Sequence, residues 1–123
     1  MNCPKCDAAM ESVTFQSVQV DRCTACGGIW FDASELEELK KIHGSEAIDT
    51  GDRETGQKMD PVRKVNCPVC HTPMIAMSDI HHPHLHYESC KVCYGAFFDA
   101  GEFHTYKKHG VLDFIVDLVN RRS

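Results

Sequence analysis

Apolar and polar residues alternate in two short stretches of the chain, and each stretch predicts a β-hairpin. Between residues 13 and 20, apolar side chains stand at every second position on both sides of Gln16 and Ser17. A period of two is typical of strands that bury one face, and the polar pair between them predicts the turn. A second hairpin is expected to pair residues 75–77 with residues 85–87 across the longer tip SDIHHPH.

Each hairpin is followed by a segment with the features of a short helix. Asp32 can cap the first helix while Glu35, three residues further on, reaches back to the cap in a capping box. Asp99 and Glu102 repeat this spacing after the second hairpin. Both helices are expected to end at a glycine, at positions 44 and 110, because a helix end favours a residue in the left-handed conformation.

The last segment, residues 111–123, has apolar residues at helical spacing: Val111, Leu112, Phe114, Ile115, Leu118 and Val119. This spacing predicts a C-terminal amphipathic helix. Its apolar stripe either docks on the preceding unit or pairs with another chain. In the second case the protein is a homo-oligomer through residues 111–123.

The chain contains an internal duplication. The segment NCPKCDAAM starting at residue 2 matches NCPVCHTPM starting at residue 66, an offset of 64 residues. The segment CTACGGIWFDASELEEL starting at residue 23 matches CKVCYGAFFDAGEFHTY starting at residue 90, an offset of 67 residues. The duplication predicts two units, residues 1–44 and residues 66–110.

Residues 45–65 join the two units. This segment is charged, contains Gly51, Gly56 and Pro61, and has no sustained apolar period. These features predict a flexible linker.

The eight cysteines form two sets, spaced C-x2-C-x16-C-x2-C and C-x2-C-x19-C-x2-C. Two residues between cysteines allow a tight turn to aim both sulfurs at one ion, and the hairpin brings back the second pair. The sets predict two structural zinc ions, held by Cys3, Cys6, Cys23 and Cys26 and by Cys67, Cys70, Cys90 and Cys93. Units of this size rarely fold on a core alone, so we expect folding to require the metal.

Other uses of the cysteines fit the sequence less well. Disulfides require an exported chain, whereas Cys3 follows the first two residues directly and no apolar stretch approaches the ~18 residues of a membrane helix. We therefore expect a cytoplasmic protein that does not enter membranes. A thioredoxin-like site lacks its βαβ pattern. Catalytic zinc keeps an open position that four thiolates do not leave, so we expect no enzyme.

The motif C-P-x-C, a methionine four residues later and C-x-x-C-G-G-x-W-F-D-x-x-E-L resemble the transcription-factor-IIB-type zinc-ribbon family over roughly residues 2–42 and 66–108. The second copy departs from the pattern where Tyr94 replaces the first glycine and Phe97 replaces the tryptophan. The resemblance implies a small zinc-dependent α+β fold. It would consist of two tandem zinc ribbons, each a β-hairpin with a short helix, followed by the C-terminal amphipathic helix.

Charge bears on the choice of partner. The formal net charge is −5 and the linear sequence shows no basic cluster, although nucleic-acid affinity comes mostly from basic groups. The leading hypothesis is a non-enzymatic zinc protein that binds a protein partner, within a gene-expression or regulatory assembly. Nucleic-acid binding is the first alternative, and zinc storage or thiol redox sensing is the second.

Two further groups of residues are candidates for sites. The aromatic pairs Trp30–Phe31 and Phe97–Phe98 are candidates for exposed contacts with a partner; alternatively, one residue of each pair plugs the small core behind the zinc and the other is left exposed. In the second hairpin, His84 and His86 share one strand face and are candidates for a further metal site, with a solvated polar face as the alternative.

Overall fold

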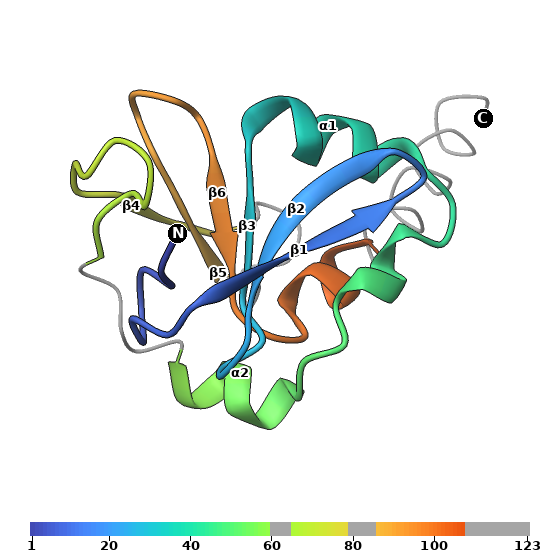
Figure 1. The fold of residues 1–123 in the computed structure, drawn as a ribbon, viewed down its shortest axis with the longest axis horizontal. Coiled ribbons are helices and arrows are strands. Elements are labelled where there is room, and N and C mark those ends of the chain that lie inside the picture. Colours follow the sequence, from blue (N-terminus) through green and yellow to red (C-terminus); the bar gives the residue numbers. More distant parts are fainter. Residues whose placement is uncertain (60–64, 79–85, 108–123) are drawn as a thin grey trace, which may run out of the picture.

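The computed structural model describes residues 1–59, 65–78 and 86–107 (Figure 1). Several sequence-based predictions concern residues outside this part of the chain: Leu85, His84, Gly110 and the amphipathic helix at residues 111–123. Within the described residues, no helix is long and apolar enough to cross a membrane.

The first copy forms three strands: β1 (Met10–Phe15), β2 (Val18–Cys23) and β3 (Ile29–Phe31). Strands β1 and β2 are the predicted hairpin, with Val13 opposite Val20. Gln16 and Ser17 form its tip with positive φ angles of 46° and 73°. Two such residues in succession make the turn whose twist matches that of a hairpin.

The second copy repeats the arrangement with strands β4 (Ile75–Ser78), β5 (His86–Ser89) and β6 (Ala96–Phe98). Met77 lies opposite Tyr87, as the alternation predicts. Ile75 lies opposite Ser89, and its expected partner Leu85 is outside the described residues.

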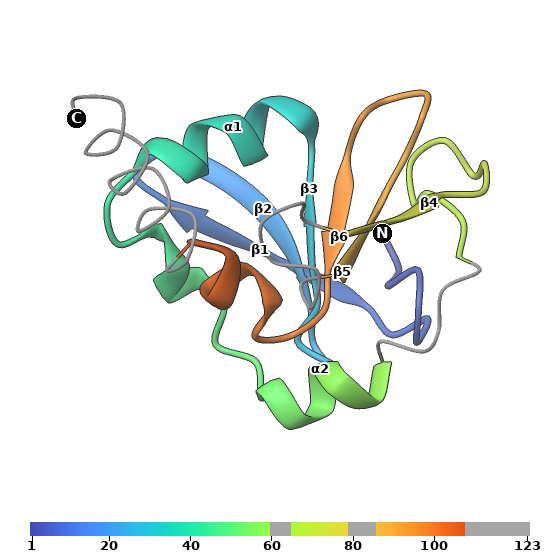
Figure 2. The same ribbon diagram turned by 180° about the vertical axis from the view of Figure 1, so that it is seen from behind.

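The two ribbons join into one six-stranded sheet of order β1-β2-β3-β6-β5-β4 (Figures 1 and 2). The join is the antiparallel pair β3–β6, in which Trp30 lies opposite Phe97. These two residues are also equivalent in the duplication. The sheet therefore has an approximate twofold axis at this pair, and the tandem ribbons share one structure.

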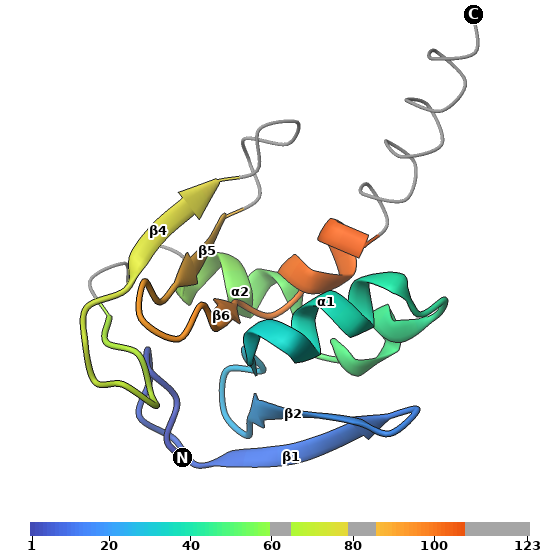
Figure 3. The ribbon, with the colours of Figure 1, turned by 90° about the horizontal axis from the view of Figure 1, so that it is seen from above.

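Helix α1 (Ala33–Lys41) begins with the predicted capping box. The backbone N–H of Asp32 donates to the Glu35 carboxylate at 2.7 Å. Gly44, three residues beyond the helix, has a φ of +84°, as expected for the left-handed position. In the second copy residues 102–107 are helical, and Glu102 N–H donates to the Asp99 carbonyl at 3.0 Å. Both helices lie on one side of the sheet (Figure 3).

The prediction of a flexible linker is wrong for residues 45–59, which have regular structure. They form the 3-10 helix η1 (Ser45–Ile48) and α2 (Arg53–Met59), which crosses one end of the sheet (Figure 1). Asp49 anchors this segment, because its carboxylate accepts the N–H groups of Gly101 and His104 at 2.9 and 3.0 Å. Composition suggested a linker because groups that hold these residues are distant in sequence: Arg22 of the first copy, which donates to the Ile48 carbonyl at 2.9 Å, and Gly101 and His104 of the second.

Residues alternate along β3 and β6 between two hydrophobic clusters, one on each face of the sheet. Trp30 and Phe97 belong to the cluster that contains the buried cysteines. The other cluster contains Phe31, Phe98 and Leu39 of α1, together with Phe103. The core thus runs through both copies on both faces.

Candidate metal centres

The first group of cysteines comes from the ends of two strands. Cys3 and Cys6 lie in the turn before β1, while Cys23 ends β2 and Cys26 lies in the turn before β3. Their four sulfurs lie within 4.8 Å of one another, with Cys3 3.7 Å from Cys26 and Cys6 3.3 Å from Cys23. Sulfurs placed at about 2.3 Å around one zinc ion stand roughly 3.8 Å apart, so the group fits a tetrahedral site.

The second group has the same construction. Cys67 and Cys70 precede β4, and Cys90 and Cys93 lie between β5 and β6. Again all four sulfurs lie within 4.8 Å of one another, and Cys67 is 3.7 Å from Cys93. This separation also matches a zinc tetrahedron.

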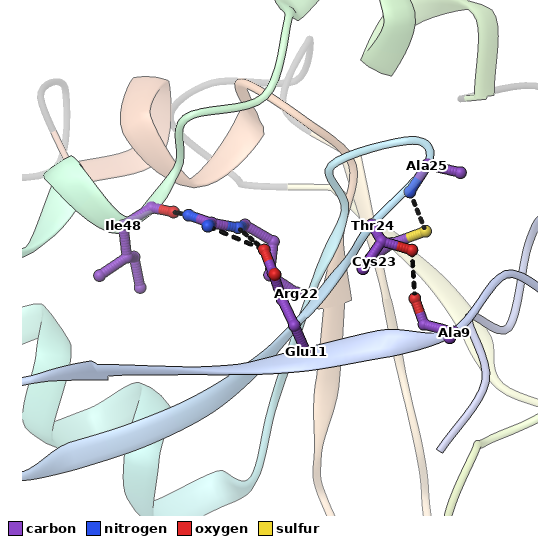
Figure 4. Close-up of polar contacts among 7 residues, drawn as sticks. All are labelled: Ala9, Glu11, Arg22, Cys23, Thr24, Ala25 and Ile48. Carbon is purple, nitrogen blue, oxygen red and sulfur yellow. Dashed lines mark hydrogen bonds and ion pairs between the residues drawn. The ribbon is translucent and has the colours of Figure 1, made fainter.

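Backbone N–H groups support the sulfur of the first cysteine in each of the four turns. The N–H group of Ala25 points at the Cys23 sulfur at 3.3 Å (Figure 4), and that of Cys26 does so at the same distance. The turns at Cys67 and Cys90 repeat this pattern. Such donors favour a thiolate over a thiol. The Thr24 hydroxyl donates to the Ala9 carbonyl at 2.8 Å (Figure 4). This bond links the turn between Cys23 and Cys26 to the segment that follows Cys6.

Each turn closes on a residue in the left-handed conformation. These residues are Asp7, Gly27, His71 and Tyr94, with φ between 61° and 78°. The chain must reverse immediately after the second cysteine so that its N–H groups stay directed at the sulfur. Three of the four positions carry a side chain at a backbone conformation that favours glycine.

The thiols of each group interact strongly in the absence of a cation. The pKa of Cys3 is raised, first by its hydrogen bond with Cys26 and then by burial. Burial, with the neighbouring thiols, raises the pKa of Cys93 to about 12. Burial acts in the same direction on Cys90, but the N–H groups of Cys93 and Val92, together with the Thr72 hydroxyl and the Cys93 thiol, outweigh it and lower the pKa to about 6. Four adjacent sulfurs thus become thiolates together only beside a positive ion.

The two groups are structural zinc sites. Four thiolates fill the tetrahedral coordination of zinc, which is the arrangement of closed, structural sites. When bound, each ion links both turns of its ribbon and so holds the hairpin to the strand that joins the copies. The eight predicted ligands all lie in these two groups.

A buried ion-pair cluster links the first zinc turn to the second copy. The Lys5 side chain is fully buried, and its ammonium lies 3.0 Å from the Glu88 carboxylate and 2.8 Å from that of Asp99. It also donates to the Met59 carbonyl at the end of α2, at 3.2 Å. Sequence reasoning missed this cluster. The one local indication is that Lys5, within C-P-K-C, corresponds to an apolar Val69 in the second copy.

The aromatic pairs proposed as partner contacts are core residues in this structure. Trp30, Phe31 and Phe97 are 0% exposed and Phe98 is 2% exposed. Trp30 and Phe97 pack with the cysteines, as expected for one residue of each pair, whereas Phe31 and Phe98 are buried in the cluster on the other face of the sheet. None of the four presents a surface for a partner. The remaining candidates, His84 and His86, are not tested: His84 is outside the described residues, and His86 is described only as the first residue of β5.

Comparison with curated proteins found no match, and neither did comparison with solved structures. The model of one family, described as transcription factor zinc-finger, matches residues 2–42 and 66–109. The two matched segments contain the two cysteine groups and the six strands of the sheet. The chain therefore belongs to the transcription-factor-IIB-type zinc-ribbon family, with two tandem copies of the ribbon.

Proposed function

We propose that this protein is a non-enzymatic binding module that holds a protein partner on the surface of its second ribbon. The supporting observation is that large apolar side chains are exposed around the second zinc site. Tyr94 is 70% exposed, Val92 63% and Val69 49%. Each of them belongs to a zinc turn, so the metal holds all three in fixed positions.

The first ribbon provides an internal comparison. Its equivalents of Val69, Val92 and Tyr94 are Lys5, Ala25 and Gly27, a buried ion-pair residue, a small residue and a glycine. Both ribbons bind zinc, so the metal does not require the larger apolar residues. Exposed apolar groups gathered in one place are characteristic of interaction sites.

Tyr94 supports the proposal most directly. It has a φ of +61°, where the first ribbon has Gly27 at +78°. A residue with a side chain costs roughly 1 kcal/mol or more in this conformation, relative to glycine. Because the Tyr94 ring is exposed, core packing offsets little of that cost. A contact between Tyr94 and a partner accounts for a tyrosine at this position, because tyrosine is enriched among the residues that dominate binding energy.

A matched pair of variants tests the proposal. Val92→Asp places a charge on the second zinc turn, and Ala25→Asp places it at the equivalent position of the first. Zinc-loaded full chains of both variants, of Tyr94→Gly and of the wild type would be immobilised and used to capture proteins from cell lysate. We expect specific partners on the wild type and Ala25→Asp, and their loss on Val92→Asp and Tyr94→Gly. Identical captured proteins on all four chains would contradict the proposal.

Nucleic-acid binding remains a second candidate, because the fold brings basic residues of the second copy beside those at the end of α1. A cavity of about 550 Å³ lies between the end of α1 and residues 102–107. Among the described residues that line it, Glu46 is the one acidic residue, and the basic residues are Lys40, Lys41, His43, His104 and Lys107. Lys107 is engaged within the fold, since its ammonium donates to the carbonyls of residues 39, 40 and 42.

Fluorescence anisotropy with labelled DNA and RNA tests this candidate at low and at physiological salt. Binding that weakens steeply with salt and is lost in Lys41→Glu would favour it over protein binding. Absence of binding even at low salt would exclude it.

A further inference from the structure

The sulfurs of the two zinc sites differ in their access to solvent. All eight cysteines are among the described residues, and Cys6 is the exposed one. The other three ligands of its site, Cys3, Cys23 and Cys26, are buried, and its equivalent in the second copy, Cys70, is half-buried. The oxidation of a thiolate depends on its exposure. Cys6 is therefore the ligand that a dissolved oxidant reaches most readily.

Hydrogen bonding also distinguishes Cys6 from the other ligands of its site. The sulfurs of Cys3 and Cys23 each accept two backbone N–H groups, whereas the N–H group directed at the Cys6 sulfur is that of Ala8. Donors of this kind stabilise a thiolate and lower its nucleophilicity. The most accessible sulfur thus also keeps more of its nucleophilicity.

A second thiolate lies beside Cys6. The sulfurs of Cys6 and Cys23 are 3.3 Å apart, compared with 3.7 Å for those of Cys3 and Cys26. An oxidised cysteine condenses with a neighbouring thiol to give a disulfide. Because Cys23 is buried, it is placed to react with Cys6 rather than with a dissolved oxidant.

The second copy differs at the residue beside the corresponding sulfur. Cys90 is the equivalent of Cys23, and the Thr72 hydroxyl lies 3.8 Å from its sulfur. At the offset of 64 residues, Ala8 stands at the position of Thr72. The hydroxyl stabilises the Cys90 thiolate, whereas an alanine side chain offers no such donor. The sulfur that would attack an oxidised neighbour is therefore less nucleophilic in the second copy.

We propose that Cys6 is a site of oxidation by peroxides, where a disulfide with Cys23 forms and the first zinc ion is released. Hydrogen peroxide transfers one oxygen to the Cys6 thiolate: an S–O bond forms, the O–O bond breaks and hydroxide leaves. The Cys23 thiolate then attacks this sulfenic acid, forms the S–S bond and displaces a second hydroxide. Two electrons pass from the thiolates to the peroxide, and two protons convert the hydroxides to water. The two remaining thiolates no longer complete the tetrahedral site.

Oxidation of Cys6 should also change the second copy. Lys5 precedes Cys6, and its buried ammonium lies 3.0 Å from the Glu88 carboxylate and 2.8 Å from that of Asp99. Release of the first ion frees the turn that carries this lysine, and so weakens its contact with the second copy. The inference does not depend on the proposed function, because it concerns the chemistry of the first zinc site.

Treatment of the zinc-loaded full chain with hydrogen peroxide tests the proposal, with released zinc measured by a chromophoric chelator. We expect one ion per chain in a fast phase and the second ion at least fivefold more slowly. Mass spectrometry after alkylation should locate a Cys6–Cys23 disulfide at the end of the fast phase. Dithiothreitol with added zinc should restore two ions per chain. Hydrogen exchange in β5 should be faster in the oxidised protein than in the reduced protein.

Three variants test the contrast between the copies. Ala8→Thr introduces the hydroxyl found in the second copy and should slow the fast phase at least threefold. Thr72→Ala makes the reciprocal change and should quicken the slow phase by a similar factor. Ala9→Thr, at the adjacent exposed residue, is the matched control and should change each rate less than twofold. A content of two zinc ions per chain before oxidation confirms that each variant is folded.

Three outcomes would overturn the inference. The first is release of both ions at one rate, or release of the second-site ion before the first. The second is a disulfide between other cysteines, or a Cys6 that remains a sulfenic acid, since either result excludes Cys23 as the attacking thiolate. The third is an unchanged rate in both Ala8→Thr and Thr72→Ala, which would show that the sulfur beside these residues takes no part in the reaction.

Discussion

Trp30 and Phe97 lie directly opposite each other across the β3–β6 pair, and each packs against a glycine of the other copy. A Cβ atom on Gly28 would lie 2.3 Å from the Phe97 ring, and a Cβ on Gly95 would lie 2.3 Å from the Trp30 ring. The two large rings therefore fit because a glycine stands beside each of them. This reciprocal contact is where the duplicated ribbons become one structure.

Gly28→Ala should destabilise the protein by about 1–3 kcal/mol, the usual range for overpacking a core. The added methyl group must displace the Phe97 ring, which is fully buried and has little room to move. Urea unfolding of the zinc-loaded protein measures the change.

The second-site variant Phe97→Leu provides the control, since the smaller side chain makes room for the methyl group. In a double-mutant cycle, the combined variant should lose less stability than the sum of the single variants. Strict additivity would show that the Gly28–Phe97 contact is not the source of the effect.

Loss of one zinc ion should affect both copies. Cys67→Ser is expected to lower the zinc content from two ions per chain to one, because the remaining three sulfurs no longer complete the second site. The strand β6 then loses its support, and the β3–β6 pair should open with it. Hydrogen exchange should therefore quicken in β3 of the first copy as well as in the second.

Cys3→Ser is the reciprocal variant, with the expected quickening in β6. Titration of the wild type with a chelator should likewise show a single unfolding transition. Two separate transitions, or undisturbed exchange in the unmodified copy, would mean that the ribbons fold independently.

Lys5→Met should be strongly destabilising, by about 3–5 kcal/mol, although the new side chain is similar in length. The substitution leaves the buried carboxylates of Glu88 and Asp99 without the ammonium that lies within 3.0 Å of both. Lys91→Met, at an exposed lysine of the second zinc turn, is the control and should change stability by less than about 0.5 kcal/mol. Equal unfolding midpoints for the two variants would count against a structural role of the cluster.

Asp49→Ala should loosen the segment between the copies. The variant removes the carboxylate that accepts the N–H groups of Gly101 and His104, two charge-assisted hydrogen bonds. We expect a loss of about 2 kcal/mol in stability and faster proteolysis within residues 45–59. Glu38→Ala, at an exposed residue of α1, provides the comparison. Unchanged proteolysis would restore the interpretation of this segment as a linker.

Tyr94→Gly should leave the fold intact and raise its stability by roughly 1 kcal/mol, because glycine adopts a φ of +61° without strain. The same variant should weaken partner capture. A gain in stability accompanied by a loss of binding is expected where a strained residue is kept for function. Strong destabilisation would show instead that the ring supports the second zinc turn.

The sequence predicted the parts of this protein whose causes are local. The spacing of the eight cysteines identified both zinc sites, because a metal turn needs its ligands at fixed short intervals. Alternation predicted the hairpins, and the Asp32–Glu35 spacing predicted the start of α1. The duplication and the family motifs extended these predictions to both copies.

Only the tertiary structure decided how the copies join and which surfaces remain free. The joining strands are three residues long and pair across residues far apart in sequence, so neither periodicity nor composition reveals them. That pairing buries Trp30 and Phe97, aligns Lys5 with two carboxylates of the other copy, and orders the segment around Asp49. It also places β4 at an edge of the sheet. A side chain's exposure depends on which distant segment packs against it, and the local sequence pattern does not identify that segment.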